Sequence, residues 1–414
     1  MKIKTIQAKW IHVPIPDNQQ HRSDFGVVAS FDMTLIRIET ECGLIGHGEA
    51  KATVASAGDN RALSVMIEQE LGPALIGQDC RQISKHWENL YSGVRGHYAL
   101  DRGHVFPILG RRGITISAIS GIDMALWDLL GQSLNAPVWQ LLGGRRHETM
   151  PAYASGGWAD VNNIGQQLKS YIDRGGFKAV KMRIGVADGE VRHSVERVKA
   201  AREALGEDVD LMCDAHGTYT VSEAKRFCRM VEELNIAWFE EPVTADDKKG
   251  LKEIRASTDI PIATGENEAT RFAFRDLADL RAADIFQPDL AICGGITEAM
   301  RIAAIASANQ ILLAPHLWGG ALMFAAGLQV CAWAQGLARA CEEGRPLQWL
   351  PDRPGAWADL QAGGRTLSAR PHLWASGARL SHARPPCLHR CAAQRDRHQS
   401  EGGPVPYRLH PGGV

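Results

Sequence analysis

Several features that define other classes of protein are missing from this chain of 414 residues. No run reaches about 18 uninterrupted apolar residues, which is the length that a transmembrane helix needs. The N-terminal residues MKIKTIQAKW alternate like a strand and lack the apolar region of a signal peptide, so we expect a cytoplasmic protein. The formal net charge is -1, and the first 340 residues contain no lysine- or arginine-rich run. Nothing here would attract nucleic acid or an anionic membrane, which favours a small molecule as the partner.

The nine cysteines follow no pattern of paired spacing. Five of them lie inside or beside apolar runs: Cys42, Cys213, Cys228, Cys293 and Cys331. Such positions are typical of reduced, buried thiols and not of a disulfide framework. Cys387 and Cys391 have no second pair of ligands in the sequence, which argues against a structural zinc site there.

The composition is that of a folded protein, with 45% apolar and 22% charged residues, and the length allows two or three domains. Residues 1–125 combine alternating, strand-like segments with stretches of helical periodicity, which predicts a separate α+β domain. From about residue 150 onward, seven short apolar runs alternate with helical segments. Short strands that are apolar throughout are typical of buried parallel strands. We therefore expect a barrel over residues 126–350.

The last segment, residues 351–414, departs from this pattern. It contains nine arginines, five histidines and eight prolines but no lysine. It shows neither helical nor strand periodicity, so we expect irregular structure there. Two explanations remain open. The first is an arginine-rich interaction tail. The second is a segment without a function, either a disordered tail or the product of a reading-frame slip in a GC-rich gene.

Five polar residues recur along the middle of the chain at nearly equal steps: Asp214, Glu240, Glu266, Asp289 and His316. The steps are 26, 26, 23 and 27 residues, which is about the length of one strand-helix unit. Each residue stands at the end of a short apolar run that precedes a helical stretch. The five side chains are therefore expected at the carboxyl ends of successive parallel strands, where a (β/α) barrel has its active site.

Asp214, Glu240 and Glu266 predict a metal site. Three carboxylates that converge at a barrel mouth repel one another, and a divalent cation relieves that repulsion. Oxygen ligands without cysteine or histidine suit a hard ion, so we expect one Mg²⁺ per subunit. Taken singly, each acid has an ordinary alternative, because Asp and Glu residues at strand ends also cap helices or pair with neighbouring cations.

Asp289 and His316 are predicted to form a dyad. A carboxylate that accepts a hydrogen bond from one imidazole nitrogen fixes the tautomer and raises the basicity of the other nitrogen, which makes a general base. Lys181 and Arg183 alternate onto one face of the segment KAVKMRIG, so both should point into the barrel, where Lys181 can neutralise a substrate carboxylate. The alternatives are a structural histidine in the barrel wall and a salt-bridge pair inside the barrel.

Together these residues resemble a known family. Their order along the chain is similar to that of the mandelate racemase subgroup of the enolase superfamily. That order is a Lys-x-basic pair, an Asp, the Glu of EEP, the Glu of GEN, and then an Asp and a His. SGIDMALWDLLGQSLNAPVWQLLGG and CGGITEAMRIAAIA also resemble that subgroup, so the similarity spans roughly residues 1–335. The resemblance implies an α/β fold, a modified (β/α)7β TIM barrel with an N-terminal α+β capping domain. It also implies Mg²⁺, abstraction of a proton α to a carboxylate, and homo-oligomers from dimer to octamer.

Two departures from the subgroup bear on the reaction. Arg183 stands where members that use both faces of the substrate carry a second lysine, and a guanidinium is a poor proton acceptor, which disfavours a racemase. His216 forms the Asp-x-His arrangement of some acid-sugar dehydratases, where the histidine handles the leaving hydroxyl; it could also support a ligand residue or contact the substrate. We therefore expect an Mg²⁺-dependent aldonate or aldarate dehydratase, a lyase. Its catalytic residues would be Lys181, Arg183, His216, Asp289 and His316, of which the first three would also bind substrate.

Three other functions remain open: a racemase or epimerase, a sugar-lactone cycloisomerase, and an inactive member that only binds acid sugars. Specificity is expected in the capping-domain loops at residues 17–31 and 92–112, where His21 and Tyr98 are candidate substrate contacts.

The resemblance ends near the C-terminal segment, because no eighth strand is evident after about Arg339. Relatives place a glutamate on that strand, and Glu342 and Glu343 lack the apolar context expected for it.

Overall fold

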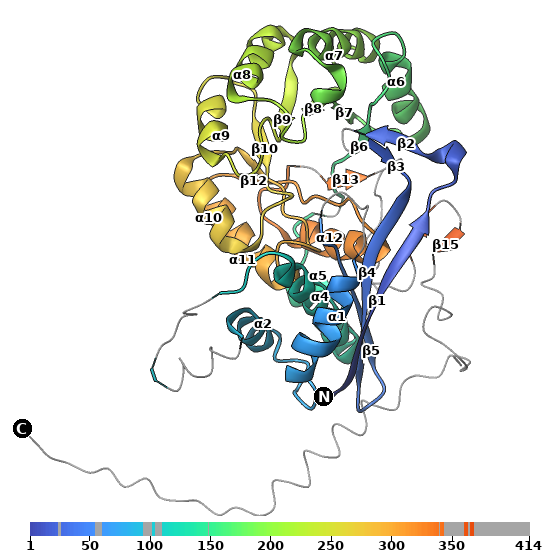
Figure 1. The fold of residues 1–414 in the computed structure, drawn as a ribbon, viewed down its shortest axis with the longest axis vertical. Coiled ribbons are helices and arrows are strands. Elements are labelled where there is room, and N and C mark those ends of the chain that lie inside the picture. The colour runs from blue at the N-terminus through green and yellow to red at the C-terminus, as the bar shows by residue number, and fades with distance from the viewer. Residues whose placement is uncertain are drawn as a thin grey trace, which may run out of the picture.

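The computed structural model of the chain has a three-stranded antiparallel sheet, with its helices, beside a parallel barrel (Figure 1). It describes residues 1–23, 26–53, 60–93, 102–103, 110–147, 149–338, 340–342, 360–362 and 365–367. The candidate substrate contact Tyr98 lies outside this part of the chain.

The N-terminal sheet has the strand order β1-β4-β5, and both pairs are antiparallel. Its strands are β1 (Ile3–Pro14), β4 (Ser30–Thr40) and β5 (Ile45–Ala50), and a short hairpin of β2 (His21–Ser23) and β3 (Gly26–Val28) lies between β1 and β4 in the chain. Along β4 every second residue is buried, including Ile36 and Ile38, because successive side chains of a strand point to opposite faces. This sheet therefore has one face on the core, as its alternating sequence predicted.

The helical part of this domain covers the inner face of the sheet. Its elements are α1 (Arg61–Val65), the π-helical turn η2 (Met66–Leu71), η3 (Gly72–Ala74), α2 (Ile83–Ser92) and α4 (Ile114–Leu134). The short turn η1 (Asp17–Gln19) lies between β1 and β2 in the chain, and α5 (Val138–Leu141) follows α4. Buried residues of α1, η2, α2 and α4, among them Leu63, Ile67 and Trp87, share one hydrophobic core with Ile36 and Ile38 of β4, whereas Val138 of α5 belongs to the barrel core.

Helix α4 is the central packing element of the molecule. It is long and apolar enough to cross a membrane, but 78% of its most apolar window is buried inside the protein, which is the pattern of a core helix. Gly48 of β5 allows the close contact, because a Cβ there would collide with the carbonyl oxygen of Gly121. On its other side α4 packs against the barrel helix α11 (Gly295–Ala308), so it joins the two domains.

The barrel sheet has the strand order β12-β11-β10-β9-β8-β7-β6-β13, and its pairs are parallel. The strands are β6 (Ala152–Gly156), β7 (Ala179–Arg183), β8 (Asp210–Asp214), β9 (Ile236–Glu240), β10 (Ile262–Thr264), β11 (Ile285–Phe286), β12 (Leu312–Leu313) and β13 (Ala340–Glu342). Most of their residues are buried, as expected for strands with helices outside and side chains inside. The fold class is confirmed.

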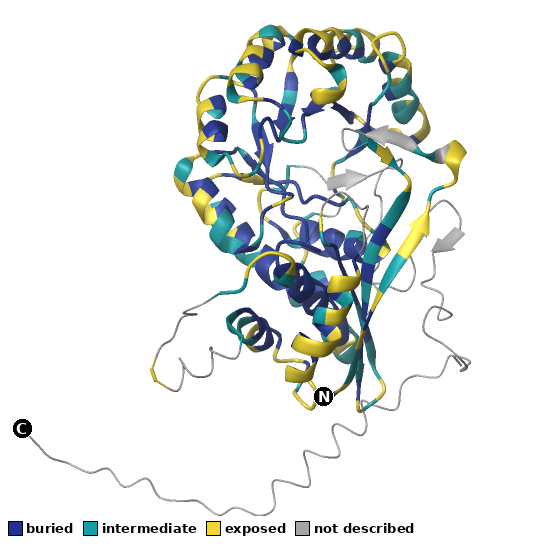
Figure 2. Ribbon diagram, viewed as in Figure 1, coloured by how far each residue is buried: buried dark blue, intermediate teal, exposed yellow. Residues whose placement is uncertain are grey.

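In the described part of the chain, seven helices surround the barrel and connect its strands. They are α6 (Ile164–Gly175), α7 (Val191–Leu205), α8 (Val221–Met230), α9 (Lys248–Arg255), α10 (Thr270–Leu280), α11 and α12 (Ala321–Trp333), with short turns η4 (Val186–Asp188) and η5 (Glu232–Leu234). Helix α8 begins with a capping box between Thr220 and Glu223, and α9 is capped by Asp247, whose carboxylate accepts from Gly250 N. Figure 2 shows the result, with exposed residues on the outer helices and buried residues on the strands and on α4.

The prediction that no eighth strand follows Arg339 is wrong. Strand β13 pairs in parallel with β6, with Ala340 opposite Ala152. Just before β13, Ala338 N donates to Leu313 O of β12 at 2.7 Å, so backbone pairing continues around the barrel. The sequence hid this strand because three residues of mixed polarity carry no periodic signal.

Two further strands lie within residues 351–414, where the sequence predicted irregular structure. They are β14 (Leu360–Ala362) and β15 (Arg365–Leu367), which pair antiparallel. The remainder of that segment lies outside the described residues.

Candidate active site

The three predicted metal ligands end neighbouring strands of the barrel. Asp214 is the last residue of β8, Glu240 is the last of β9, and Glu266 follows β10 by two residues. Asp214 and Glu240 are direct partners in the register of their strands. All three side chains are buried, with residue exposures of 0%, 0% and 2%. The fold therefore concentrates three carboxyl groups at the carboxyl ends of the strands.

Two cations from β7 lie among these carboxylates. The ammonium group of Lys181 donates to Glu240 and lies 3.0 Å from Asp214 Oδ2. The guanidinium group of Arg183 donates to Asp214. Both residues are buried, because strand alternation places them on the same face of β7. In this arrangement they balance part of the negative charge of the site.

The carboxyl groups differ in their pKa because their surroundings differ. At Asp214 burial acts to raise the pKa, but nearby cations, Arg183 first, outweigh it and hold the pKa well below its usual value. At Glu240 burial and the neighbouring Asp214 charge raise the pKa. At Glu266 burial and three neighbouring carboxylates, Glu241 first, raise the pKa well above its usual value. The crowding of these acids therefore disfavours the charged forms of Glu240 and Glu266.

The chemistry of this donor set fits a hard divalent cation. Glu266 Oε2 is buried and has no hydrogen-bond partner among the described residues, and uncompensated carboxylate oxygens are the ligands that Mg²⁺ prefers. The side chains are not arranged around such an ion. No three His, Cys, Asp or Glu side chains in the described part of the chain form a group that could hold a metal. Lys181 and Arg183 are instead the partners of Asp214.

Asp289 and His316 follow the next two strands and form the predicted pair. His316 Nδ1 lies 2.8 Å from Asp289 Oδ2, and the two residues form an isolated parallel β-bridge. His316 Nε2 faces the acidic cluster, 3.4 Å from Glu266 Oε2. One imidazole nitrogen is thus held by a carboxylate, and the other is directed at the carboxylate site.

Burial controls the protonation of this pair. It lowers the pKa of His316 to about 4, although Asp289 acts in the opposite direction. Burial acts to raise the pKa of Asp289, but the charge of Lys51 and the hydrogen bond from His316 outweigh it and leave this pKa below its usual value. At neutral pH this arrangement has a neutral imidazole beside an ionised carboxylate, which is the state of a general base.

Two charged residues at the end of β5 enter the site from the other domain, and the sequence analysis missed both. Lys51 Nζ donates to Asp289 Oδ2 at 2.7 Å and also to the carbonyl oxygen of Trp318. Glu49 is fully buried and accepts hydrogen bonds from the backbone of Gly320 at 2.7 Å and of Met323 at 3.2 Å. The segment HGEAK contains a hint, since acidic and basic residues rarely end a buried strand without partners.

Glu241 is a third residue that the sequence analysis did not identify. It is 3% exposed, and burial together with the charge of Asp214 raises its pKa to about 8. Asn267 Nδ2 donates to its two carboxylate oxygens at 3.2 and 3.3 Å. Strand alternation after Glu240 would turn Glu241 away from the site, but its φ of 36° breaks that alternation.

His216 lies beside the predicted metal ligands. Its backbone N donates to Asp214 Oδ1 at 2.9 Å, and its Nε2 lies 3.8 Å from Asp214 Oδ2. Its φ is 46°, a left-handed conformation that the short turn after β8 requires. Of the two predicted contacts in the capping loops, His21 belongs to β2, and its side chain, like Tyr98, lies outside the described part of the structure.

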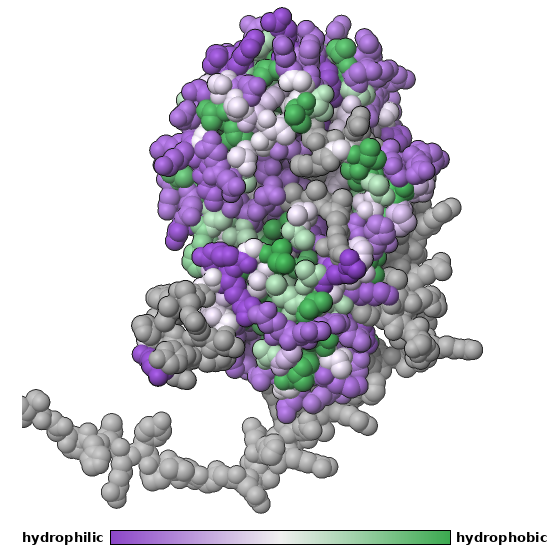
Figure 3. All heavy atoms as spheres, in the orientation of Figure 1, coloured by the Kyte–Doolittle hydropathy of each residue, from purple (hydrophilic) through white to green (hydrophobic). Residues whose placement is uncertain are grey.

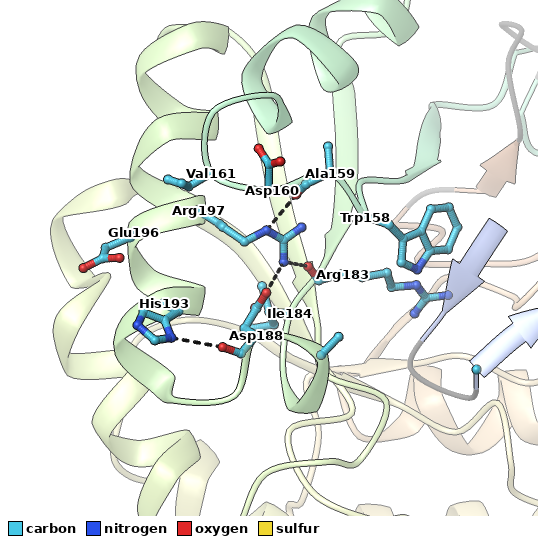
Figure 4. A pocket seen from close by; sticks show the side chains of 12 residues that line it. Trp158, Ala159, Asp160, Val161, Arg183, Ile184, Asp188, His193, Glu196 and Arg197 are labelled. Carbon is cyan, nitrogen blue, oxygen red and sulfur yellow. Dashed lines mark hydrogen bonds and ion pairs between the residues drawn. The ribbon is translucent and has the colours of Figure 1, made fainter.

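A cleft of about 660 Å³ opens beside Arg183 (Figure 4). Its described lining includes Gly26 of the N-terminal domain, Trp158 after β6, and Asp188 and Arg197 on the barrel side. Arg197 donates to Ala159 O at 2.9 Å and to Asp188 Oδ1 at 2.7 Å, which fixes the wall. The barrel rim on the face drawn in Figure 3 is mostly hydrophilic. The cleft thus gives an approach to the Arg183 side of the site that is lined by both charged and apolar residues.

These features define a class of protein. The strand ends of a parallel (β/α) barrel hold carboxylates, cations and a carboxylate-histidine pair. A second domain adds side chains to the same end. This arrangement is that of a barrel enzyme with an acid-base site. Sequence models of two domain families match the chain. They are "Mandelate racemase / muconate lactonizing enzyme, N-terminal domain" over residues 5–143 and "Enolase C-terminal domain-like" over residues 163–371. The chain belongs to the mandelate racemase and muconate lactonizing enzyme family of the enolase superfamily, which confirms the predicted family.

Individual relatives agree with this assignment. The chain is 36% identical to D-galactarolactone cycloisomerase of Agrobacterium fabrum over 72% of its length and 74% of that protein. It is 34% identical to arabinonate dehydratase of Saccharolobus solfataricus, over 73% of this chain and 76% of the relative. A crystal structure of a racemase from Streptomyces coelicolor A3(2) with bound magnesium superimposes with a TM-score of 0.75 and 29% identity, covering 86% of this chain and 96% of that one.

Proposed function

We propose that the protein is an Mg²⁺-dependent acid-sugar dehydratase that acts on an aldonate or aldarate. It would remove the proton α to the substrate carboxylate, eliminate the β-hydroxyl as water, and release a 2-keto-3-deoxy acid. The observation that carries the proposal is the geometry of His316, whose Nδ1 lies 2.8 Å from Asp289 Oδ2 and whose Nε2 is directed at the carboxylate site. The similarity to arabinonate dehydratase supports the reaction type.

Asp214, Glu240 and Glu266 are the residues that would hold the metal. When bound there, a divalent cation would supply positive charge that stabilises the negative charge developing on the substrate carboxylate. Lys181 and Arg183 lie next to the same acids, so they would bind and orient the substrate carboxylate from the β7 side. Buried donors that are already in place contribute most in such a site, because they need little reorganisation when charge develops.

The proton transfers are assigned to two histidines. His316 Nε2 accepts the α-proton while its Nδ1–H donates to Asp289, which fixes the tautomer and stabilises the imidazolium that forms. The C–O bond of the β-hydroxyl then breaks, and His216, which lies on the Asp214 side, donates a proton so that water leaves. The resulting enol becomes the 2-keto acid by taking up a proton at the neighbouring carbon.

A sugar-lactone cycloisomerase is the second candidate, because the chain is also 36% identical to D-galactarolactone cycloisomerase. That reaction begins with the same removal of an α-proton, so the barrel residues do not distinguish it. The two reactions differ in the group that leaves, which is a hydroxyl in the dehydratase and a lactone oxygen in the cycloisomerase.

The test is proton exchange in D₂O, followed by NMR on a panel of aldonic acids, aldaric acids and their lactones with purified protein and Mg²⁺. A 2-keto product supports the dehydratase, whereas a rearranged lactone supports the cycloisomerase. Exchange without a keto product supports a racemase or epimerase. Replacing His316 by Asn should abolish α-proton exchange, and unchanged exchange in that variant would remove the proposed mechanism.

A further inference from the structure

Lys51 is a buried lysine of the N-terminal domain that donates hydrogen bonds to two acceptors in the barrel. It directly follows β5 and is 1% exposed. Its ammonium group donates to Asp289 Oδ2 at 2.7 Å and to the carbonyl oxygen of Trp318. Burying a lysine is costly unless its charge is compensated, so this placement depends on both barrel acceptors.

The two acceptors of Lys51 belong to the two halves of the proton-transfer pair. Asp289 follows β11, and Trp318 stands two residues after His316 in the segment that follows β12. The same oxygen, Asp289 Oδ2, also accepts from His316 Nδ1 at 2.8 Å, while Asp289 Oδ1 accepts from Ala291 N at 2.8 Å. One ammonium group therefore links the carboxylate to the segment that carries the imidazole.

Simple adhesion between the domains does not require this lysine. Trp87 of α2 donates to Gly294 O at 2.8 Å, and the guanidinium groups of Arg271 and Arg301 lie 5.4 and 4.8 Å from its ring centroid. Glu49 separately holds the start of α12 through Gly320 and Met323. Among these residues, Lys51 is the one that contacts the Asp289–His316 pair, through its hydrogen bond to Asp289.

We propose that Lys51 is a positioning residue for the reaction. The N-terminal domain supplies this lysine, and its ammonium group holds Asp289 and the segment that carries His316 at the spacing that proton transfer needs. The proposal rests on the proposed function for its catalytic consequence, but the geometry that it describes is independent of the substrate. The lysine would act through Asp289 and would not touch the substrate.

The first test needs no substrate. A buried imidazole N–H that donates to a carboxylate gives a far-downfield proton signal in NMR, which the variant His316→Asn would identify by its loss. We expect this signal in the wild type and in Lys4→Met, a control variant that removes an exposed lysine of the same sheet, which pairs with Glu39. We expect it to be lost or shifted in Lys51→Met. Absence of the signal in the wild type, or an unchanged signal in Lys51→Met, overturns the proposal.

The second test is kinetic and uses a double-mutant cycle. In Lys51→Met, kcat should fall about a hundredfold, since displacing a catalytic group by about 1 Å can cost that much, while KM changes little because Lys181 and Arg183 are untouched. If Lys51 acts through Asp289, adding Lys51→Met to Asp289→Asn should change the α-proton exchange rate by less than about threefold. Additive effects, an unchanged kcat, or a change confined to KM would contradict the positioning role.

A folding defect would not obscure the result. If Lys51→Met alone is unstable because the buried Asp289 loses the positive charge of Lys51, the double variant has neither charge and is compared directly with Asp289→Asn. A wild type that shows the NMR signal but no turnover would refute the proposed reaction and leave the placement of Lys51 to be decided by the signal alone.

Discussion

At the scale of single residues, Glu266 is a buried carboxyl group with three acidic neighbours. Its Oε2 has no hydrogen-bond partner among the described residues, and burial with its acidic neighbours raises its pKa well above the usual value. Glu266→Gln should therefore weaken Mg²⁺ binding about tenfold or more, because it removes one full charge from a three-carboxylate site. Isothermal titration calorimetry measures this affinity.

A nearby residue provides the control for that experiment. Glu268, two positions further along, pairs with Lys248 at 2.9 Å and is not among the proposed ligands. Glu268→Gln should keep the wild-type affinity for Mg²⁺. Equal affinities in the two variants would remove Glu266 from the metal site.

The site residues that could be predicted from the sequence are those whose position follows from the neighbouring residues in the chain. Asp214, Glu240 and His316 each end an apolar run, so strand-helix periodicity alone placed them at one end of the barrel. Lys51 could not be found in this way, because its partner Asp289 is 238 residues away. Glu241 was missed because a positive φ reverses the direction that strand alternation predicts.

At the scale of elements, the contact between β5 and α4 depends on the absence of side chains at two glycines. A Cβ on Gly48 would meet the carbonyl oxygen of Gly121, which belongs to a helix backbone and has no room to move. Gly48→Ala should lower the free energy of unfolding by about 1–3 kcal/mol, the usual cost of overpacking, measured by urea denaturation. The exposed β1 variant Lys9→Ala should change it by less than about 0.5 kcal/mol. Equal stability of the two variants would show that α4 shifts freely on the sheet.

The elements that the sequence predicted best are the long periodic ones. Strand β4 alternates along its own sequence, and it lies within residues 1–125, where the alternating segments predicted strands of an α+β domain. Strand β13 has three residues, and its assignment depends on pairing with β6 far away in the chain. Short strands of this kind are defined by their neighbours and not by their own sequence.

At the scale of the whole molecule, a buried carboxyl group between the domains makes stability depend on pH. Asp123 of α4 accepts from Thr297 of α11, and burial raises its pKa to about 7. The folded protein then keeps this proton up to about pH 7, whereas the unfolded chain releases it near pH 4. The free energy of unfolding should therefore fall as pH rises between these values, by up to about 1.4 kcal/mol per pH unit.

The variant Asp123→Asn isolates this contribution. The difference in unfolding free energy between the wild type and Asp123→Asn should change in favour of the variant as pH rises from about 4 to about 7, and then remain constant. Urea denaturation at about one-unit pH steps measures the difference. A difference that is independent of pH would show that Asp123 is ionised in the folded protein.

The pairing of β13 with β6 has a consequence for how the chain folds. Ala340 must reach Ala152 before the ring closes, so the contact that completes the barrel spans most of the catalytic domain. Such non-local contacts form late and slow folding. During synthesis the nascent sheet would keep two open edges, at β6 and β12, until residue 340 has emerged from the ribosome. Chains that stop before this point would expose those edges to other chains, and aggregation would begin there.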